Sequence, residues 1–196
     1  MAGVSELSDD PWRLERFVAA QDEVGTFQRA VTELRAGAKR GHWMWFVFPQ
    51  IAGLGTSSTA RHYAITSLDE ARAYLAHPVL GTRLRECARI VADTEGRTAE
   101  QIFGLIDALK LRSSMTLFAE ADAAGEPVFH AVLAKFFGGV PDEATLTRLL
   151  ERSATHLRAG ITRPVITTLA SLVAQRQISG VHPALPVAGG PVMLAR

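Results

Sequence analysis

The segment KRGHWMWFVFPQIAGLGTSSTARHY, residues 39–63, is the most informative part of the chain for predicting its fold. Within seven residues it places a histidine, two tryptophans and two phenylalanines, and after Pro49 it continues as a Gly/Ser/Thr-rich loop. Large aromatic side chains bury more apolar area per residue than others. The segment therefore predicts either the centre of the core or the wall of a pocket. The WMWFVF run is too short for periodicity to separate an extended segment from a buried helical turn.

Helical patterns flank this segment on both sides. Upstream, apolar residues at helical spacing predict one amphipathic helix or two abutting ones over residues 11–34, with a stop near Gly37. Downstream, Ser67 and Thr98 each start a capping-box pattern that opens a helix. Further helices are expected over residues 80–91, 105–124 (with a turn inside), 127–137, 142–150 and 164–177. Since no strand–helix alternation is visible, we predict an all-α, multihelical, single compact domain.

We expect three parts along the chain: a helical domain (10–152), a C-terminal helical appendage (153–178) and a flexible tail (179–196). The predicted appendage helix, Pro164–Gln177, carries the apolar stripe Val165, Leu169, Leu172 and Val173. Such a stripe suits docking on its own domain or on a second copy, so a homodimer could form through this helix.

Composition narrows the class of protein. The chain has 196 residues, 47% of them apolar, and a net charge of +1, which gives no reason to expect a nucleic-acid partner. Its one cysteine, Cys87, excludes an internal disulfide, and it lies in a helical pattern that favours a core thiol. The N-terminal residues lack a signal-peptide pattern, and no apolar run approaches the roughly 20 residues of a membrane span. We therefore predict a soluble, cytoplasmic protein without membrane contact.

The loop Gly53–Ser58 allows two interpretations. It is not a dinucleotide fingerprint, because Ser58 stands in place of the third glycine and no βαβ unit follows. Its backbone N–H groups and hydroxyls, with Arg61 close behind, could still hold a phosphate or carboxylate. Alternatively, Ser57, Ser58 or Thr59 is an ordinary helix N-cap, which is the commoner role of such residues.

The aromatic run also allows a functional and a structural interpretation. His42 could act as an acid, a base or a phosphate donor, although a lone histidine is more often structural. Trp43 and Trp45 could stack on a base or sugar, although isolated tryptophans more often belong to a core.

A second unusual patch is DALKLRSSMTLF, residues 107–118. On a helix, Lys110 pairs with Ser114 and Arg112 with Thr116, which would present a cationic, hydroxyl-bearing ledge to a ligand. The simpler interpretation is that the hydroxyls bond to the helix backbone and the charges are solvated. Walker A, G-x-S-x-G and H-E-x-x-H motifs are absent, and the six histidines are scattered singly, so we expect no metal site and no cofactor.

Three segments together resemble the DUF1810 family of uncharacterised bacterial proteins: GHWMWFVFPQIAGLG, SLDEARAYLAHPVLGTRLRECARIV and IFGLIDALKLRSSMTLFA. The similarity extends in order from about residue 14 to residue 150, and it implies a multihelical fold of the mycobacterial Rv1873-like type. It implies no activity. Family members commonly have serine at the position of Gly41 and a different interior between Gly104 and Asp107, and the chain beyond about Arg152 lies outside the family pattern.

If the two patches meet in space, they would form a concave site with aromatic walls and convergent polar groups. Our leading hypothesis is a pocket for a small anionic, ring-bearing ligand, such as a nucleotide or an ADP-ribose-like compound. Hydrolysis of a glycosidic or phosphoester bond would suit it, and whether the protein is an enzyme stays open. The acid/base candidates are His42 and Asp107. The ligand-binding candidates are Lys39, Trp43, Trp45, Gln50, Ser57, Ser58, Arg61, Tyr63, Lys110, Arg112, Ser113 and Ser114.

The alternative is a non-enzymatic protein-interaction module in which the tryptophan-rich motif is purely structural. Solvent accessibility separates the two hypotheses. Buried Trp43, Trp45 and His42 without an adjoining cavity would favour the module.

Overall fold

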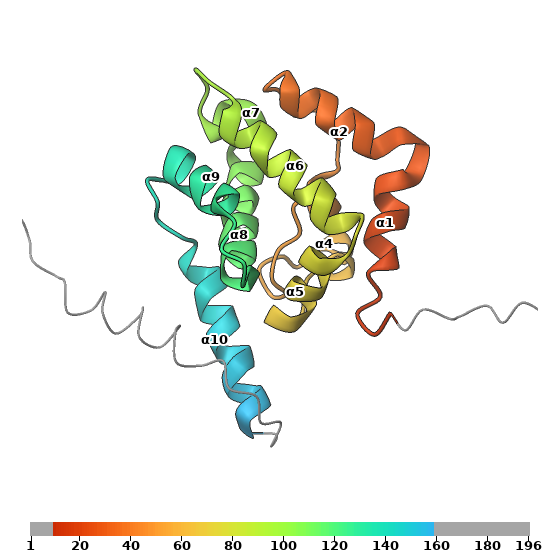
Figure 1. Ribbon diagram of the computed structural model, residues 1–196, viewed down its shortest axis with the longest axis vertical. Helices are drawn as coiled ribbons and strands as arrows, with labels where there is room; N and C mark the ends of the chain where they lie inside the picture. Colours follow the sequence, from red (N-terminus) through yellow and green to blue (C-terminus); the bar gives the residue numbers. More distant parts are fainter. Residues whose placement is uncertain (1–9, 159–196) are drawn as a thin grey trace, which may run out of the picture. The chain divides into compact units, whose positions relative to one another are not determined.

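Helices make up most of the computed structural model, which describes residues 10–158 (Figure 1). Of the described residues, 10–155 belong to one compact unit, and a second unit begins at His156. Among the described residues the elements are α1 (Glu15–Asp22), the 3-10 helix η1 (Glu23–Gly25), α2 (Thr26–Arg35), α3 (Met44–Val47), α4 (Ser58–His62), α5 (Leu68–Ala76), α6 (Leu80–Asp93), α7 (Ala99–Phe103), α8 (Leu105–Ala121), α9 (Pro127–Phe137) and α10 (Glu143–Arg158). The predicted all-α class is confirmed.

The N-terminal pattern forms two abutting helices rather than one. Positive φ angles at Val24 (45°) and Gly25 (68°) interrupt the helical backbone between α1 and α2. The aromatic run forms a helical turn, α3, and not an extended segment. Beyond it, Ile51 and Ile65 make an isolated parallel bridge, which brings together the two ends of the segment that contains α4. Within residues 10–158 this bridge is the extent of β-type pairing.

The helix α8 is the centre of the core, and it packs against α5, α7 and α9 (Figure 1). Leu111, Met115 and Phe118 are fully buried, as their shared helical face predicted. The turn expected inside this helix is absent: α8 is continuous from Leu105 to Ala121. A buried Cys87 in α6 is confirmed as a core thiol, and burial raises its pKa to about 12.

Two of the predicted helix ends differ from expectation. Thr98 and Gln101 form the full reciprocal capping box at the start of α7. Ser67 caps α5, but the Glu70 carboxylate accepts from Thr66 and does not complete a capping box with Ser67. Asp142 accepts hydrogen bonds from Thr145, but α10 runs to Arg158 rather than stopping near residue 150. The predicted helix Pro164–Gln177 and the tail 179–196 lie outside the described residues, and the three-part division remains a prediction.

A buried ion pair joins α1 to α5. Arg16 Nη2 lies 2.6 Å from Glu70 Oε1, and the two side chains are only 12% and 2% exposed. Glu70 Oε2 accepts from both the backbone N–H and the hydroxyl of Thr66. The Arg16 guanidinium also donates to the carbonyl oxygens of His62 and Ala64, at the end of α4 and just beyond it. The pair therefore fixes the C-terminal end of the α4 segment against two helices.

Candidate functional site

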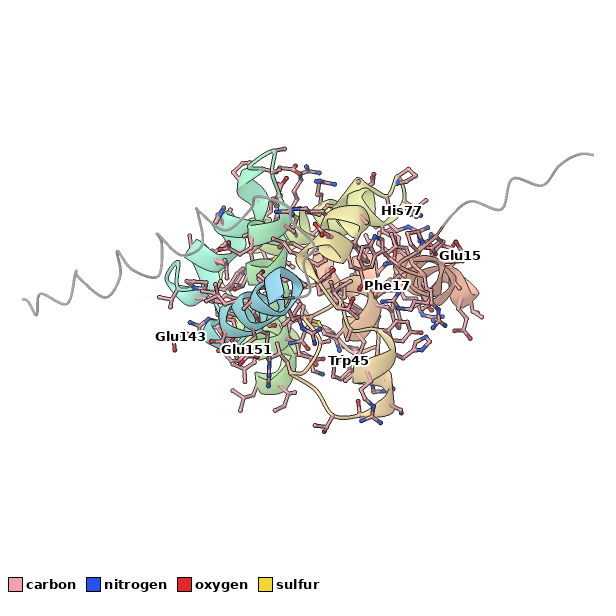
Figure 2. All side chains as sticks on the ribbon, turned by 90° about the horizontal axis from the view of Figure 1, so that it is seen from below. Glu15, Phe17, Trp45, His77, Glu143 and Glu151 are labelled. Carbon is pink, nitrogen blue, oxygen red and sulfur yellow. The ribbon has the colours of Figure 1, made fainter. Side chains whose placement is uncertain are left out.

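The α4 segment encloses a small pocket of about 100 Å³. Four of its lining residues are among the predicted ligand-binding residues: Trp45, Gln50, Arg61 and Tyr63. The complete lining is Trp45, Gln50, Ile51, Ala52, Gly53, Gly55, Ala60, Arg61, Tyr63, Ala64 and Thr66. Trp45 is half-buried on the helical turn α3, where Figure 2 labels it.

Close packing holds the walls of this pocket in place. Tyr63 packs edge-on against Phe46, with ring centroids 5.3 Å apart, and also contacts Phe17. A Cβ atom at Gly55 would lie 2.6 Å from the Ala60 Cβ and 3.7 Å from the Trp45 ring. Only glycine fits there without a shift of the backbone, because a Cβ atom would clash with the Ala60 side chain of α4, whereas its distance to the indole is an ordinary contact. The loop glycine predicted to cradle an anion therefore has a packing role.

The hydroxyls of this loop follow the simpler interpretation. Ser57 is the N-cap of α4 and accepts from the backbone N–H of Ala60 at 3.0 Å. Ser58 is the first helical residue and is exposed. Neither residue is part of the pocket lining.

An ionic cluster from the second patch lies beside Trp45. Asp107, on the first turn of α8, accepts Lys110 Nζ at 2.7 Å on one oxygen and lies 2.6 Å from Lys39 Nζ on the other. Lys110 Nζ also sits 3.8 Å from the centroid of the Trp45 ring. The structure thus brings the two sequence windows together, with Trp45 between the pocket and the cluster of Lys39, Asp107 and Lys110.

The two ammonium groups set the charge state of Asp107. Burial, the largest single influence, raises the pKa of this carboxyl, but hydrogen bonds and charge attraction from Lys110 and Lys39 outweigh it and lower the pKa. A carboxylate held ionised by two bonded cations is a weak base and carries no proton to donate. Its place next to Trp45 therefore suits a structural or electrostatic role better than the acid/base role first predicted for it.

We expect Asp107 to make stability depend on acid pH. Because its pKa is lower in the folded protein than the ordinary value of 3.8, its contribution is fully present above that pH and is lost as the pH falls through the folded value. The gap in unfolding free energy between the wild type and Asp107→Asn should be constant above about pH 5 and should shrink below about pH 4. Urea unfolding from pH 3 to 7 measures this gap. A gap that widens on acidification would contradict the assignment.

The Glu33 carboxylate was missed by sequence reasoning, yet it holds the start of the aromatic segment. Its Oε2 accepts from the backbone N–H groups of Arg40 (2.7 Å) and Gly41 (2.8 Å) and from Trp43 Nε1 (2.8 Å). Burial raises the pKa of Glu33, but these hydrogen bonds bring it below the usual value. A glutamate on the polar side of an amphipathic helix gives no sequence signal for such a role.

Several predicted ligand-binding residues have structural positions instead. Trp43 is 2% exposed and belongs to the core, so it offers no free stacking face. Arg112 donates to the carbonyl oxygens of Val140 and Pro141, between α9 and α10. Ser113 shares a 2.7 Å hydrogen bond with Thr145 of α10, and Ser114 is fully buried. We leave these four out of the candidate site.

His42 lies three positions after Lys39 in the sequence, and it is exposed. No hydrogen bond joins its ring to another described residue. Its accessibility and the pocket next to Trp45 do not match the fully buried pattern that would favour a purely structural motif.

The helix α10 contributes to the pocket in a way the sequence did not reveal. Arg152 donates to the carbonyl oxygens of Ala52 (3.3 Å) and Thr66 (2.9 Å), which both line the pocket. The Arg148 guanidinium lies against Gly53: a Cβ built there would be 3.2 Å from Nε and 3.5 Å from Cζ. Two arginines far away in sequence therefore support one rim of the pocket.

Other kinds of site find no counterpart in residues 10–158. No group of three or more histidine, cysteine, aspartate or glutamate side chains there could hold a metal ion. None of the helices in that range is long and apolar enough to cross a membrane.

Comparison with known proteins agrees with this fold. Residues 11–149 match the model of a family described as "Protein of unknown function (DUF1810)". The crystal structure of the conserved hypothetical protein Rv1873 from Mycobacterium tuberculosis is similar, with 55% sequence identity and a TM-score of 0.69. The similarity covers 72% of this chain and 99% of that one. No curated protein matches the chain.

Proposed function

Because this chain belongs to the DUF1810 family, whose description assigns no function, we propose one from the geometry: the pocket beside Trp45 binds a small anionic, ring-bearing ligand. A nucleotide or an ADP-ribose-like compound would satisfy that description. We propose binding alone, because Asp107 is ionised and paired with both Lys39 and Lys110, and so it supports no acid/base step.

One observation carries the proposal: aromatic faces, a cation and unoccupied polar groups converge on the same pocket. Trp45 and Tyr63 supply rings, and the exposed Arg61 supplies charge. Gln50 and Tyr63 also line the pocket, and within the described residues neither the Gln50 side-chain amide nor the Tyr63 hydroxyl has a hydrogen-bond partner. A concave site with apolar walls and a few convergent polar groups is the usual form of a ligand site.

The size of the pocket limits what enters it. Its volume of about 100 Å³ is below the roughly 300 Å³ at which sites for whole drug-sized ligands begin. The pocket would hold one end of a ligand, such as its anionic group. A ring attached to that group would then lie on the half-exposed Trp45. The Lys110 ammonium already makes a cation–π contact with this indole.

A thermal-shift screen of the full chain tests the proposal, with nucleotides, NAD, ADP-ribose, sugar phosphates and small carboxylates as probes. A ligand at 100 times its dissociation constant stabilises a protein by about 2.7 kcal/mol, which for this chain means a shift of roughly 5–10 °C. Arg61→Ala and Gln50→Ala should reduce the shift. Arg35→Ala is the matched control, because that arginine is exposed and pairs loosely with Glu86 at 3.6 Å.

Either of two results would overturn the proposal. One is the absence of any shift across the panel, which would favour the interaction-module alternative. The other is a shift that Arg61→Ala and Gln50→Ala leave as large as Arg35→Ala does, because the ligand would then bind elsewhere.

A further inference from the structure

We infer that Arg148 of α10 is a second cationic residue that binds the ligand of this pocket. Together, Arg148 and Arg61 select a phosphate monoester over a diester. This inference rests on the proposed function and names the chemical class of its ligand. It adds a residue that lies outside both sequence windows from which the site was first predicted.

Arg148 lies at the rim of the pocket. Its guanidinium lies against Gly53, a lining residue with a φ of 99°, at a distance where a Cβ atom would touch it. A residue other than glycine at this position would be strained and would push the guanidinium outward. The bare backbone of Gly53 therefore lets a cation from α10 approach the rim of a pocket formed by residues 45–66.

Arg148 is also available to a ligand. Its partner Glu151 lies 3.0 Å away on the same helix, and the two side chains are 44% and 57% exposed. Figure 2 labels Glu151 on α10 and Trp45 on α3. Exposed pairs of this kind are weak, so a ligand anion can take the place of the Glu151 carboxylate. The guanidinium already lies against Gly53 at the rim, so only a change of rotamer is needed to turn its N–H groups into the pocket.

The charges around the pocket favour an anionic ligand. None of the lining residues within the described part of the chain is acidic, whereas Arg61 lines the pocket from α4 and Arg148 borders it from α10. A guanidinium presents a planar fork of N–H donors that matches phosphate oxygens. A terminal phosphate carries close to two negative charges at neutral pH and three free oxygens, so it can engage both forks. A diester carries one charge and two free oxygens, so it gains less from the second arginine.

Calorimetric titration with adenosine 5′-monophosphate and adenosine 3′,5′-cyclic monophosphate tests this selectivity. We expect the monoester to bind more tightly to the wild type. Arg148→Ala should weaken the monoester about tenfold and the cyclic diester much less, because a charge-assisted hydrogen bond to the extra oxygen is lost. Glu151→Gln should strengthen the monoester by about threefold, because it removes the competing carboxylate. Arg35→Ala, another exposed and paired arginine, should change neither.

The outcomes separate this inference from the proposed function. If a ligand from the screen binds through Arg61 but Arg148→Ala and Glu151→Gln leave its affinity unchanged, the inference is wrong and the proposed function stands. The inference is also wrong if both adenosine probes bind equally, or if neither binds while another panel ligand does. If Arg61→Ala has no effect on any ligand, both fail. Unchanged melting temperatures of the unliganded variants verify that these exposed substitutions leave the fold intact.

Discussion

Replacing Glu70 by alanine is expected to lower the free energy of unfolding by about 3–5 kcal/mol, the largest loss that we predict for one residue. Glu70 is 2% exposed and pairs with Arg16, itself only 12% exposed. The substitution leaves an uncompensated charge in the interior and removes the acceptor for two Thr66 donors. Urea unfolding monitored by circular dichroism measures the loss.

An exposed pair on the same helix supplies the matched control. Asp69 and Arg72 lie 3.1 Å apart with 65% and 35% of their side chains exposed, so Asp69→Ala should cost less than about 1 kcal/mol. In the double variant Arg16→Met/Glu70→Met no buried charge is left unpaired, and it should lose less than the sum of its single variants. Equal losses for Glu70→Ala and Asp69→Ala would show that the pair does not hold α1 to α5.

Replacing Glu33 by alanine is the second large effect, with an expected loss of about 2–4 kcal/mol. One carboxylate oxygen satisfies three donors, and among them Trp43 Nε1 belongs to a side chain that is 2% exposed. Without Glu33 the indole N–H would be buried unpaired, and the backbone from Arg40 to Gly41 would lose its fixed position. Thermal unfolding should show the loss as a decrease of roughly 4–16 °C in the melting temperature.

Two variants make this result specific. Glu33→Gln keeps a neutral acceptor of the same shape, so it should lose clearly less than Glu33→Ala. Glu86→Ala removes an exposed carboxylate 3.6 Å from Arg35, and it should be close to neutral. If Glu33→Ala were as mild as Glu86→Ala, the Lys39–Trp43 segment would be held by packing alone.

The fold could be predicted from the sequence because its signals are local. Apolar spacing and caps such as Thr98 depend on residues three or four positions apart, and these predictions matched the structure. The predictions were wrong where contacts between residues far apart in sequence determine the hydrogen bonding or the end of a helix. Glu70 pairs with Arg16 rather than closing the box with Ser67, and α10 continues past Leu150 while its Arg152 bonds to residues of the α4 segment.

The candidate site was predictable in part for the same reason. Composition picked out Trp45, Arg61, Lys39 and Lys110, and tertiary packing does bring their two windows together. Sequence could not tell Trp43 from Trp45, because only the packing shows that one indole is in the core and the other at the pocket. It also missed Glu33, Arg148 and Arg152, because only the packing shows that they contact Trp43, Gly53 and the pocket rim. The cytoplasmic location, the absence of nucleic-acid binding and the homodimer remain predictions.

The bonds from Arg152 to the pocket rim have a consequence for how the protein is made. They span 86 and 100 positions of sequence, to Thr66 and Ala52 respectively. Protein synthesis adds about 5–20 residues per second. The rim therefore waits about 4–20 seconds for the arginine that fixes it. During that interval Trp45 and its neighbours lack the part of their support that Arg152 provides.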